Sequence, residues 1–207
     1  MLITNFETAS NYINRIPTAI TPGMLQTINN WVEQFDRIHK SGSTLFIAGN
    51  GGSASSSNHF STDISIGGIR DGIKLSTRSL CESNSNITAI LNDIGPAEIF
   101  SIQLEAFAKE GDAVLLVSAS GNSQNLINCI DVADRLGVET LGMTGFEHNK
   151  LNTLVNSGIS VNASTGEYGF VEDIHSAILH LLTYSFRLFK TDKKKYENFL
   201  NREQPSE

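Results

Sequence analysis

The sequence has few cysteines, no long apolar run and no signal-peptide pattern. Its two cysteines, Cys81 and Cys129, lie far apart and lack metal or redox spacing, so we expect a reducing compartment rather than a disulfide scaffold. No apolar run approaches the roughly 18 residues of a membrane span. The N-terminus also lacks the basic-then-apolar order of a signal peptide. These absences favour a cytoplasmic protein that has no membrane partner.

The charge balance argues against a nucleic-acid partner. Lysines and arginines number 15 against 22 aspartates and glutamates, which gives a net charge of −7 at pH 7. Nucleic-acid-binding proteins present a basic face, whereas the cluster 193–195 is better explained as part of a solvated tail. The sequence contains neither a P-loop nor a Gly-x-Gly-x-x-Gly fingerprint. Neither a nucleic acid nor a nucleotide cofactor is therefore expected.

Short apolar runs of strand length alternate with amphipathic stretches along the chain. A helical region covers about 5–41, a sheet core about 44–163 and a final helix about 170–190, with a polar tail after 191. The expected strands are 45–48, 113–117, 139–143 and 157–161, with 73–80 ambiguous. This alternation predicts one α/β domain over 1–207 with a mostly parallel sheet.

Two strand-to-helix junctions have the composition of an anion site. They are the glycine-rich turn Gly49–Ser53 and the serine-rich turn Ser118–Ser123. In a parallel sheet both would lie at the C-terminal ends of strands, where ligands bind. Turn N–H groups and a helix N-terminus attract phosphate there, and serine hydroxyls can donate to its oxygens. Either turn alone is weak evidence, but the pair favours an anion site.

Histidines and carboxylates follow in two groups. His59 and Asp63 are four residues apart, which places both on one face of a helix. The final helix carries Glu172, His175 and His180. Such side chains suit zinc or another divalent ion, and they could also act as general acid and base without metal. By spacing alone, Glu172 pairs more easily with His175 than with His180, which is about 12 Å away along a straight helix.

Together these motifs resemble the bacterial phosphoheptose isomerases of the sugar-isomerase (SIS) family. The resemblance runs from about residue 10 to residue 190, in the order and spacing of the family. It is carried by Gly49–Ser53, His59 with an acid at position 63, Asn92-Asp93-x-Gly95, Ser118–Ser123 and Glu172…His180. It implies a flavodoxin-like three-layer α/β/α sandwich with roughly five strands, assembled as a homotetramer with active sites between subunits.

The resemblance also implies roles for the site residues. The substrate would be a sugar phosphate, foremost sedoheptulose 7-phosphate, converted to D-glycero-D-manno-heptose 7-phosphate for lipopolysaccharide or capsule precursors. Asp63 would be the catalytic base and His180 the catalytic acid. The implied ligands of one zinc or similar ion per site are His59, Asp63, Glu172 and His180. The implied substrate- and phosphate-binding residues are Asn50, Gly51, Gly52, Ser53, Asp93, Ser118, Ser120 and Ser123.

Three positions depart from the family pattern. Asp63 stands where the family usually has glutamate, and Glu172 stands where it usually has glutamine. Gly67 replaces an arginine that often contacts the substrate, although Arg70 is nearby. His175 is expected to support the site or to belong to the core. Two alternatives remain open, namely a non-catalytic phosphosugar-binding SIS regulator and an isomerase of another sugar phosphate.

Overall fold

The computed structural model describes residues 6–194. Its strands are β1 (Thr44–Gly49), β2 (Ser76–Ser79), β3 (Ala113–Ser118), β4 (Glu139–Gly145) and β5 (Ser157–Val161). Its α-helices are α1 (Phe6–Ala19), α2 (Pro22–Ser41), α3 (Gly52–Ile69), α4 (Asn84–Asp93), α5 (Ser101–Phe107), α6 (Gln124–Leu136), α7 (Leu151–Leu154) and α8 (Tyr168–Thr191), with a 3-10 turn η1 (Pro96–Glu98). Neighbouring strands are parallel, in the order β2-β1-β3-β4-β5.

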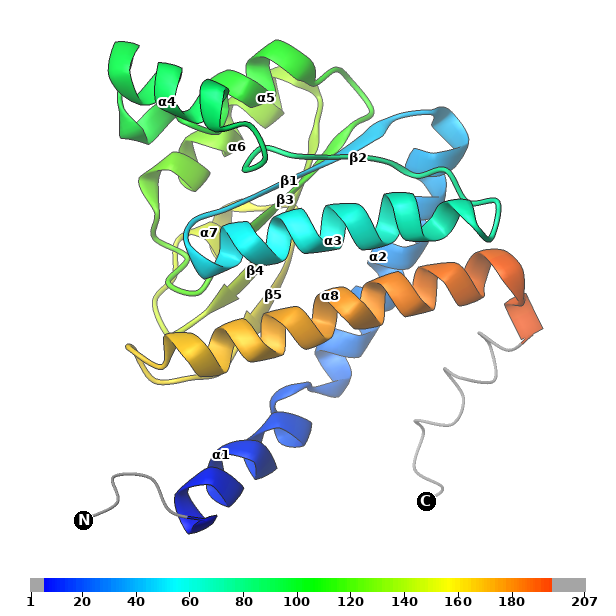
Figure 1. Ribbon diagram of the computed structural model, residues 1–207, viewed down its shortest axis with the longest axis vertical. Coiled ribbons are helices and arrows are strands. Elements are labelled where there is room, and N and C mark those ends of the chain that lie inside the picture. Colours follow the sequence, from blue (N-terminus) through cyan, green and yellow to red (C-terminus); the bar gives the residue numbers. More distant parts are fainter. Residues whose placement is uncertain (1–5, 195–207) are drawn as a thin grey trace.

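Helices cover both faces of this sheet (Figure 1). Leu45 and Ile47 of β1 point toward α2, α3 and α8 and join one apolar core. Phe46 and Ala48 point the other way and join a second core beneath α5 and α6. This alternation follows from the two-residue period of a strand, and a sheet buried on both faces needs continuous apolar strands. The expected three-layer α/β/α sandwich is confirmed.

The helices α3 and α8 lie side by side over one face of the sheet (Figure 1). Helix α8 buries Ile174, Ile178, Leu182 and Phe186. Leu181 is only partly buried, because Leu182 takes the inward position. The packing of these two long helices brings residues about 120 positions apart in sequence into contact, as the Ser56–Ser176 pair illustrates.

Helix α3 continues through Gly67 and Gly68 and stops at Ile69. Gly68 is buried, and a Cβ there would lie 3.2 Å from the carbonyl oxygen of Ile73. The glycine therefore allows the returning chain to pack closely against the helix. The amide of Ile73 also donates to the Gly68 carbonyl at 3.0 Å.

Several smaller expectations can be compared with the structure. The ambiguous region 73–80 contains the short edge strand β2. Cys81 and Cys129 are free thiols, and Cys129 is buried in the core. Lys193 and Lys194 are exposed, while position 195 and the rest of the expected tail lie outside the described residues. Within residues 6–194, no helix has the length and apolarity needed to cross a membrane.

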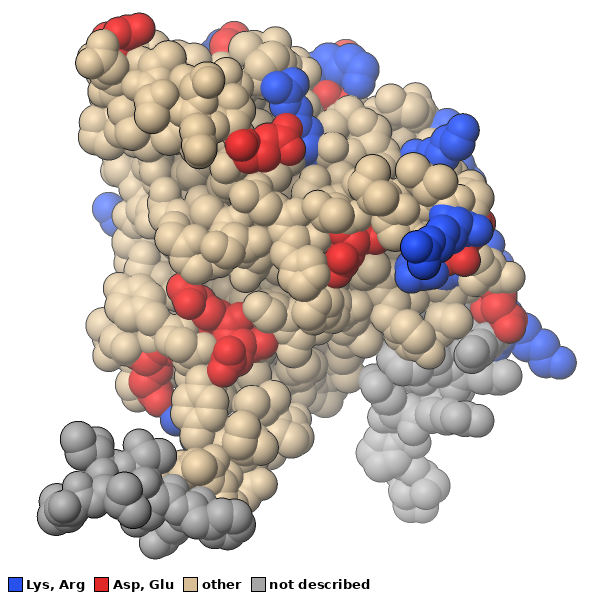
Figure 2. Space-filling view, viewed as in Figure 1, with Lys and Arg blue, Asp and Glu red and all other residues tan. Residues whose placement is uncertain are grey.

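Charged side chains are unevenly placed on the face that carries α3 and α8. Figure 2 shows acidic groups over the start of α8 and basic groups mainly toward the far ends of both helices. A further acidic group lies between these two areas. The face therefore lacks the continuous basic stripe that nucleic-acid binding would require.

Candidate active site

A small cavity of about 90 Å³ opens where β1 and β3 end. Two neighbouring turns and the start of α8 line it. Its polar lining residues are Asn50, Ser53, Ser118, Ser120, Ser123, Tyr168 and Glu172. The glycine-rich and serine-rich turns therefore meet at one cavity, as their position after parallel strands predicted.

The first turn depends on glycine for its geometry. A Cβ on Gly49 would lie 2.8 Å from the carbonyl carbon and oxygen of Ser53, so only glycine lets α3 begin so close to β1. Gly51 precedes the helix with a φ of 56°, in the region that favours glycine. The first-turn N–H groups and the positive end of the α3 dipole then face the cavity. This end of the helix is suited to an anion.

Two of the serine hydroxyls also shape the turn by accepting backbone hydrogen bonds. Ser118 Oγ accepts a hydrogen bond from the Gly121 amide at 3.0 Å, and Ser120 Oγ accepts one from Asn122 at 3.3 Å. Among the described residues, the hydroxyls of Ser53 and Ser123 have no hydrogen-bond partner. Because Ser118 and Ser120 only accept these bonds, all four hydroxyls keep their own proton and can donate it to a bound anion.

Asn50 is held by a residue that the sequence did not single out. Its side-chain amide exchanges two hydrogen bonds of 2.9 Å with the amide of Asn125, at the start of α6. This reciprocal pair ties the glycine-rich turn to the serine-rich turn. Its partner could not be read from sequence, because the two asparagines are 75 positions apart.

Glu172 lies in this cavity and its carboxylate covers the first turn of α3. A Cβ on Gly52 would come within 2.5 Å of Glu172 Oε2, which shows how closely the carboxylate approaches that backbone. The positive end of the helix dipole favours a negative group there. Glu172 therefore lines the anion cavity, where its carboxylate lies over the positive end of the α3 dipole, and it is not part of the His59/Asp63/His180 group.

A second cluster joins α3 to α8 and contains His59, Asp63 and His180. Asp63 Oδ2 lies 3.1 Å from His59 Nε2 and 3.8 Å from His180 Nε2. The two imidazole rings meet edge to face, with centroids 5.1 Å apart. Both histidines are exposed, at 60% and 58% of their side-chain surface. The residues expected from the sequence thus come together from helices that are distant in the chain.

This cluster fits a divalent ion. One ligand atom from each residue lies within 4.8 Å of the others. Ligands at about 2.1 Å around a tetrahedral zinc ion would be about 3.4 Å apart, close to the spacings between Asp63 and the two imidazoles. Glu172 is not a member of this group, since it lies two helical turns, about 12 Å, before His180. The chemistry of two imidazoles and one carboxylate suits zinc or a similar metal.

His175 belongs to the core. Its side chain is almost fully buried, with Nε2 3.1 Å from the Thr144 carbonyl oxygen at the end of β4. Burial is the main cause that lowers its pKa from 6.5 to about 4, although the Thr144 contact opposes this shift. The neutral ring therefore donates its Nε2 proton to Thr144 and holds α8 against the sheet.

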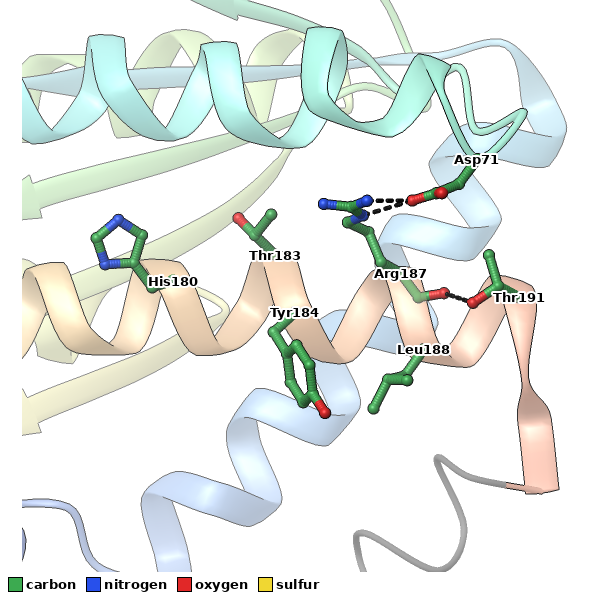
Figure 3. A pocket seen from close by; sticks show the side chains of 7 residues that line it. All are labelled: Asp71, His180, Thr183, Tyr184, Arg187, Leu188 and Thr191. Carbon is green, nitrogen blue, oxygen red and sulfur yellow. Dashed lines mark hydrogen bonds and ion pairs between the residues drawn. The ribbon is translucent and has the colours of Figure 1, made fainter.

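A groove of about 380 Å³ leads away from the cluster along α8. Figure 3 shows His180 at one end of the groove and the Asp71–Arg187 ion pair near the other end. Arg187 Nε donates to Asp71 Oδ2 at 2.7 Å. Arg70, considered as a substitute for the arginine missing at Gly67, is exposed at the end of α3 and does not line the groove. Arg187, which the sequence motifs did not indicate, lines the same groove as His180.

Asp93 lies apart from both the cavity and the cluster. It is exposed at the end of α4, and its Oδ1 accepts a hydrogen bond of 2.7 Å from the side chain of Asn92. In the described part of one chain, it lines neither the serine cavity nor the histidine cluster. A role in substrate binding would require a contribution from elsewhere.

The fold and the divided site agree with similarity to known proteins. A SIS-domain family model matches residues 10–145. This match extends over more than half of the sequence, and the chain belongs to the SIS-domain family.

Relatives within that family indicate a more specific class of protein. The probable phosphoheptose isomerase of Thermoplasma volcanium is 35% identical over 157 residues, which cover 74% of this chain and 79% of that protein. The phosphoheptose isomerase of Aliarcobacter butzleri is 31% identical over 163 residues, covering 77% and 85%. These relationships place the chain with the phosphosugar isomerases of the SIS family.

Solved structures support the same fold. The phosphoheptose isomerase GmhA from Neisseria gonorrhoeae superposes with a TM-score of 0.73 at 22% identity, covering 87% of this chain and 94% of that chain. The enzyme from Francisella tularensis gives a TM-score of 0.75 at 22% identity, covering 88% and 94%. The three-layer arrangement is therefore shared over almost the whole described chain.

Proposed function

We propose that this chain is an aldose–ketose isomerase that converts sedoheptulose 7-phosphate to D-glycero-D-manno-heptose 7-phosphate. The observation that carries the proposal is the placement of two chemically different groups along α3 and α8. An anion cavity lies at the start of both helices, and the His59/Asp63/His180 cluster lies further along them. The first suits the phosphate of a sugar, and the second suits proton transfer at its reacting end. The relatives named phosphoheptose isomerases support this substrate.

The reaction requires a proton to move between C1 and C2 through an enediol. One group must remove the proton, and another must donate to or stabilise the oxygens. We assign the base to Asp63 and the acid to His180. Both imidazoles approach Oδ2 of Asp63, which leaves its Oδ1 for the substrate proton.

A divalent ion would be held by the same three side chains. When bound, the ion would supply polarisation of the substrate carbonyl. Asp63 and His180 would then serve as ligands together with His59, and the ion rather than His180 would stabilise the substrate oxygens. We propose zinc for this role because of the ligand set.

Self-association is also part of the proposal, as a homotetramer with sites between subunits. Ile66 and Ile69 on α3 are 63% and 54% exposed beside the histidine cluster. Asp93 does not reach the serine cavity within one chain. Both observations favour a site that a neighbouring subunit completes. We place the product in lipopolysaccharide or capsule precursor synthesis, in the cytoplasm.

The test is turnover in deuterated water. The protein is incubated with sedoheptulose 7-phosphate, with and without a chelator, beside Asp63→Ala and His180→Ala. Deuterium at C2 of an aldose product, absent with both variants, is expected. Binding of the sugar phosphate without turnover would contradict the proposed isomerase activity and favour a non-catalytic SIS regulator. If only a different sugar phosphate were turned over, the proposed substrate would be wrong but the proposed reaction class would stand.

A further inference from the structure

A second polar cavity lies at the opposite edge of the sheet from the proposed active site. It has a volume of about 150 Å³, and its polar lining residues are Gln34, Arg37, Ser41, Asp112 and Glu139. They come from the second half of α2 and from the points where β3 and β4 begin. Strands β1 and β3 have six residues each, a length of about 20 Å, and the serine and glycine turns follow their other ends. The cavity is therefore separate from the proposed reaction, and an inference about it does not depend on that reaction.

One wall of this cavity carries an amide without a partner. Gln34 is only 3% exposed, and its Nε2 atom has no hydrogen-bond partner in the described part of the chain. A buried polar group without a partner lowers stability, and such groups in native proteins call for an explanation. Because the last side-chain torsion of glutamine has two alternative orientations, the amide can present a donor or an acceptor to a ligand. A polar ligand in the cavity would supply the missing partner.

The open side of the cavity carries two opposite charges that do not pair with each other. Arg37 and Glu139 are both exposed, and neither side chain forms an ion pair or a hydrogen bond with another residue of the range 6–194. The buried carboxylate of Asp112, by contrast, accepts hydrogen bonds of 2.8–2.9 Å from the Thr44 amide and from the amide and Nζ of Lys109. The charges available to a ligand are therefore one guanidinium and one carboxylate.

This combination of charges favours a zwitterion. A simple anion would meet Arg37 but would also face the carboxylates of Asp112 and Glu139, and a simple cation would face the Arg37 guanidinium. A molecule with one carboxylate and one ammonium group satisfies both free charges, because a guanidinium binds a carboxylate through two parallel hydrogen bonds. The volume of about 150 Å³ has room for about ten water-sized groups, which suits an amino acid with a short side chain.

We propose that this cavity binds an α-amino acid with an uncharged polar side chain. The amino-acid carboxylate lies on Arg37, its ammonium group lies on Glu139, and its side chain meets the amide of Gln34. This orientation follows from burial, since Gln34 is buried whereas the two charged residues are exposed. The edge of the sheet between α2 and the starts of β3 and β4 thus holds a small-molecule site for a ligand unlike the sugar phosphate.

Titration of the ¹⁵N-labelled full chain with L-serine, L-asparagine and L-glutamine, followed by NMR, tests the ligand class. At least one of the three is expected to bind with a dissociation constant of about 1 mM or lower. The shifts should centre on the backbone amides of Ser41 and Gly111 and on the side-chain amide of Gln34, which line the cavity. The amino acid that binds best is then compared with its two analogues that lack either the carboxylate or the ammonium group. Each analogue should bind at least about 10-fold more weakly, because hydrogen bonds to a charged group are lost.

Variants of the two free charges test the site itself. Arg37→Gln and Glu139→Gln should each weaken amino-acid binding by about 10–100-fold, and both should fold because the two positions are exposed. The matched controls are Arg70→Gln and Glu33→Gln, which change exposed residues that do not line the cavity. Their affinity should stay within about 2-fold of the wild type.

Gln34→Leu tests the buried amide, because its effects on stability and on binding should have opposite signs. Leucine removes the unpaired polar group, so the melting temperature without ligand should equal or exceed that of the wild type. The same change should weaken amino-acid binding. A glutamine that served only the packing of α2 would give a lower melting temperature and no specific loss of affinity.

Several results would overturn the proposal. They are a failure of all three amino acids to bind at millimolar concentration, and shifts confined to the serine and glycine turns at the other edge of the sheet. Equal binding of an analogue that lacks one charge would exclude a zwitterion site. Wild-type affinity in both Arg37→Gln and Glu139→Gln, or in Gln34→Leu, would show that the cavity does not hold the ligand.

Discussion

The anion cavity and the histidine cluster are built in opposite ways. The cavity is made by two turns in which backbone geometry, glycines and hydroxyls are fixed within a few residues of each strand end. The cluster is made by long side chains on two helices, where His59 and His180 remain exposed. Binding of the phosphate therefore depends on local backbone, whereas the reacting groups depend on how α8 packs against α3. Substitutions in the cavity and in the cluster should therefore impair different properties, namely phosphate binding and the reaction.

The largest effect is expected for a substitution in the histidine cluster. His180→Ala removes the proposed acid, and a lost general acid or base typically costs about 10²–10⁴-fold in kcat. Stability and phosphate affinity should change little, because His180 is exposed and lies outside the serine cavity. Single-turnover kinetics and calorimetry with inorganic phosphate measure the two quantities. A parallel loss of phosphate affinity would show that the parts are not separable.

The backbone dependence of the cavity predicts a stability effect at Gly49. Gly49→Ala places a Cβ against the backbone of Ser53, which cannot move without shifting the start of α3. Overpacking of this kind costs about 2–3 kcal/mol in the free energy of unfolding, measured by urea denaturation.

Gly52→Ala is the matched control for this change. There the new Cβ meets only the end of the flexible Glu172 side chain. Its free energy of unfolding should stay within about 1 kcal/mol of the wild type. Equal losses for the two variants would contradict the importance of the close strand-to-helix turn.

The burial of His175 on α8 predicts that the stability of the protein depends on pH. The pKa of His175 is lowered from 6.5 to about 4 by burial. Below pH 6.5 the unfolded state therefore binds more protons than the folded state, and stability falls as pH decreases toward 4. The loss between pH 7 and pH 5 should be about 2 kcal/mol.

Urea denaturation across this pH range measures the effect, with His175→Gln for comparison. Glutamine can still donate to Thr144 but does not titrate in this range. The variant should lose this acid-sensitive component even if it is less stable at pH 7. The same pH slope in both proteins would show that the acid sensitivity arises elsewhere.

The smallest expected effect concerns one hydroxyl of the cavity. Ser120 is partly exposed, and its hydroxyl accepts only a bond of 3.3 Å within its own turn. Ser120→Ala should weaken phosphate binding by about 1.5 kcal/mol, or about 10-fold, because one hydrogen bond to a charged group is lost. Calorimetry measures this change, and Ser55→Ala should leave the affinity unaltered.

The sequence predicted the fold and the cavity well because both depend on local patterns. The apolar runs located β1, β3, β4 and β5, and the two turns after β1 and β3 indicated the anion site. Parallel strands then bring those turns to one edge of the sheet. The close packing of Gly68 against Ile73 was not predicted, because a sequence pattern does not reveal it.

The histidine cluster was predicted only in part, since spacing within one helix cannot give the pairing between helices. His59 and Asp63 follow from a four-residue spacing, whereas His180 came from family resemblance. Arg187 was missed because its partner, Asp71, is 116 positions away. The place of Glu172 likewise depends on its contact with Gly52, which only the tertiary structure provides.

The rate of deuterium incorporation at C2 of the aldose, measured against substrate concentration, tests the divided site most directly. Ser120→Ala weakens only the hold on phosphate, so its rate should approach that of the wild type at saturating sedoheptulose 7-phosphate. His180→Ala should stay about 10²–10⁴-fold slower than the wild type at every concentration. The account would be contradicted if saturation restored His180→Ala, or if the wild type incorporated no deuterium.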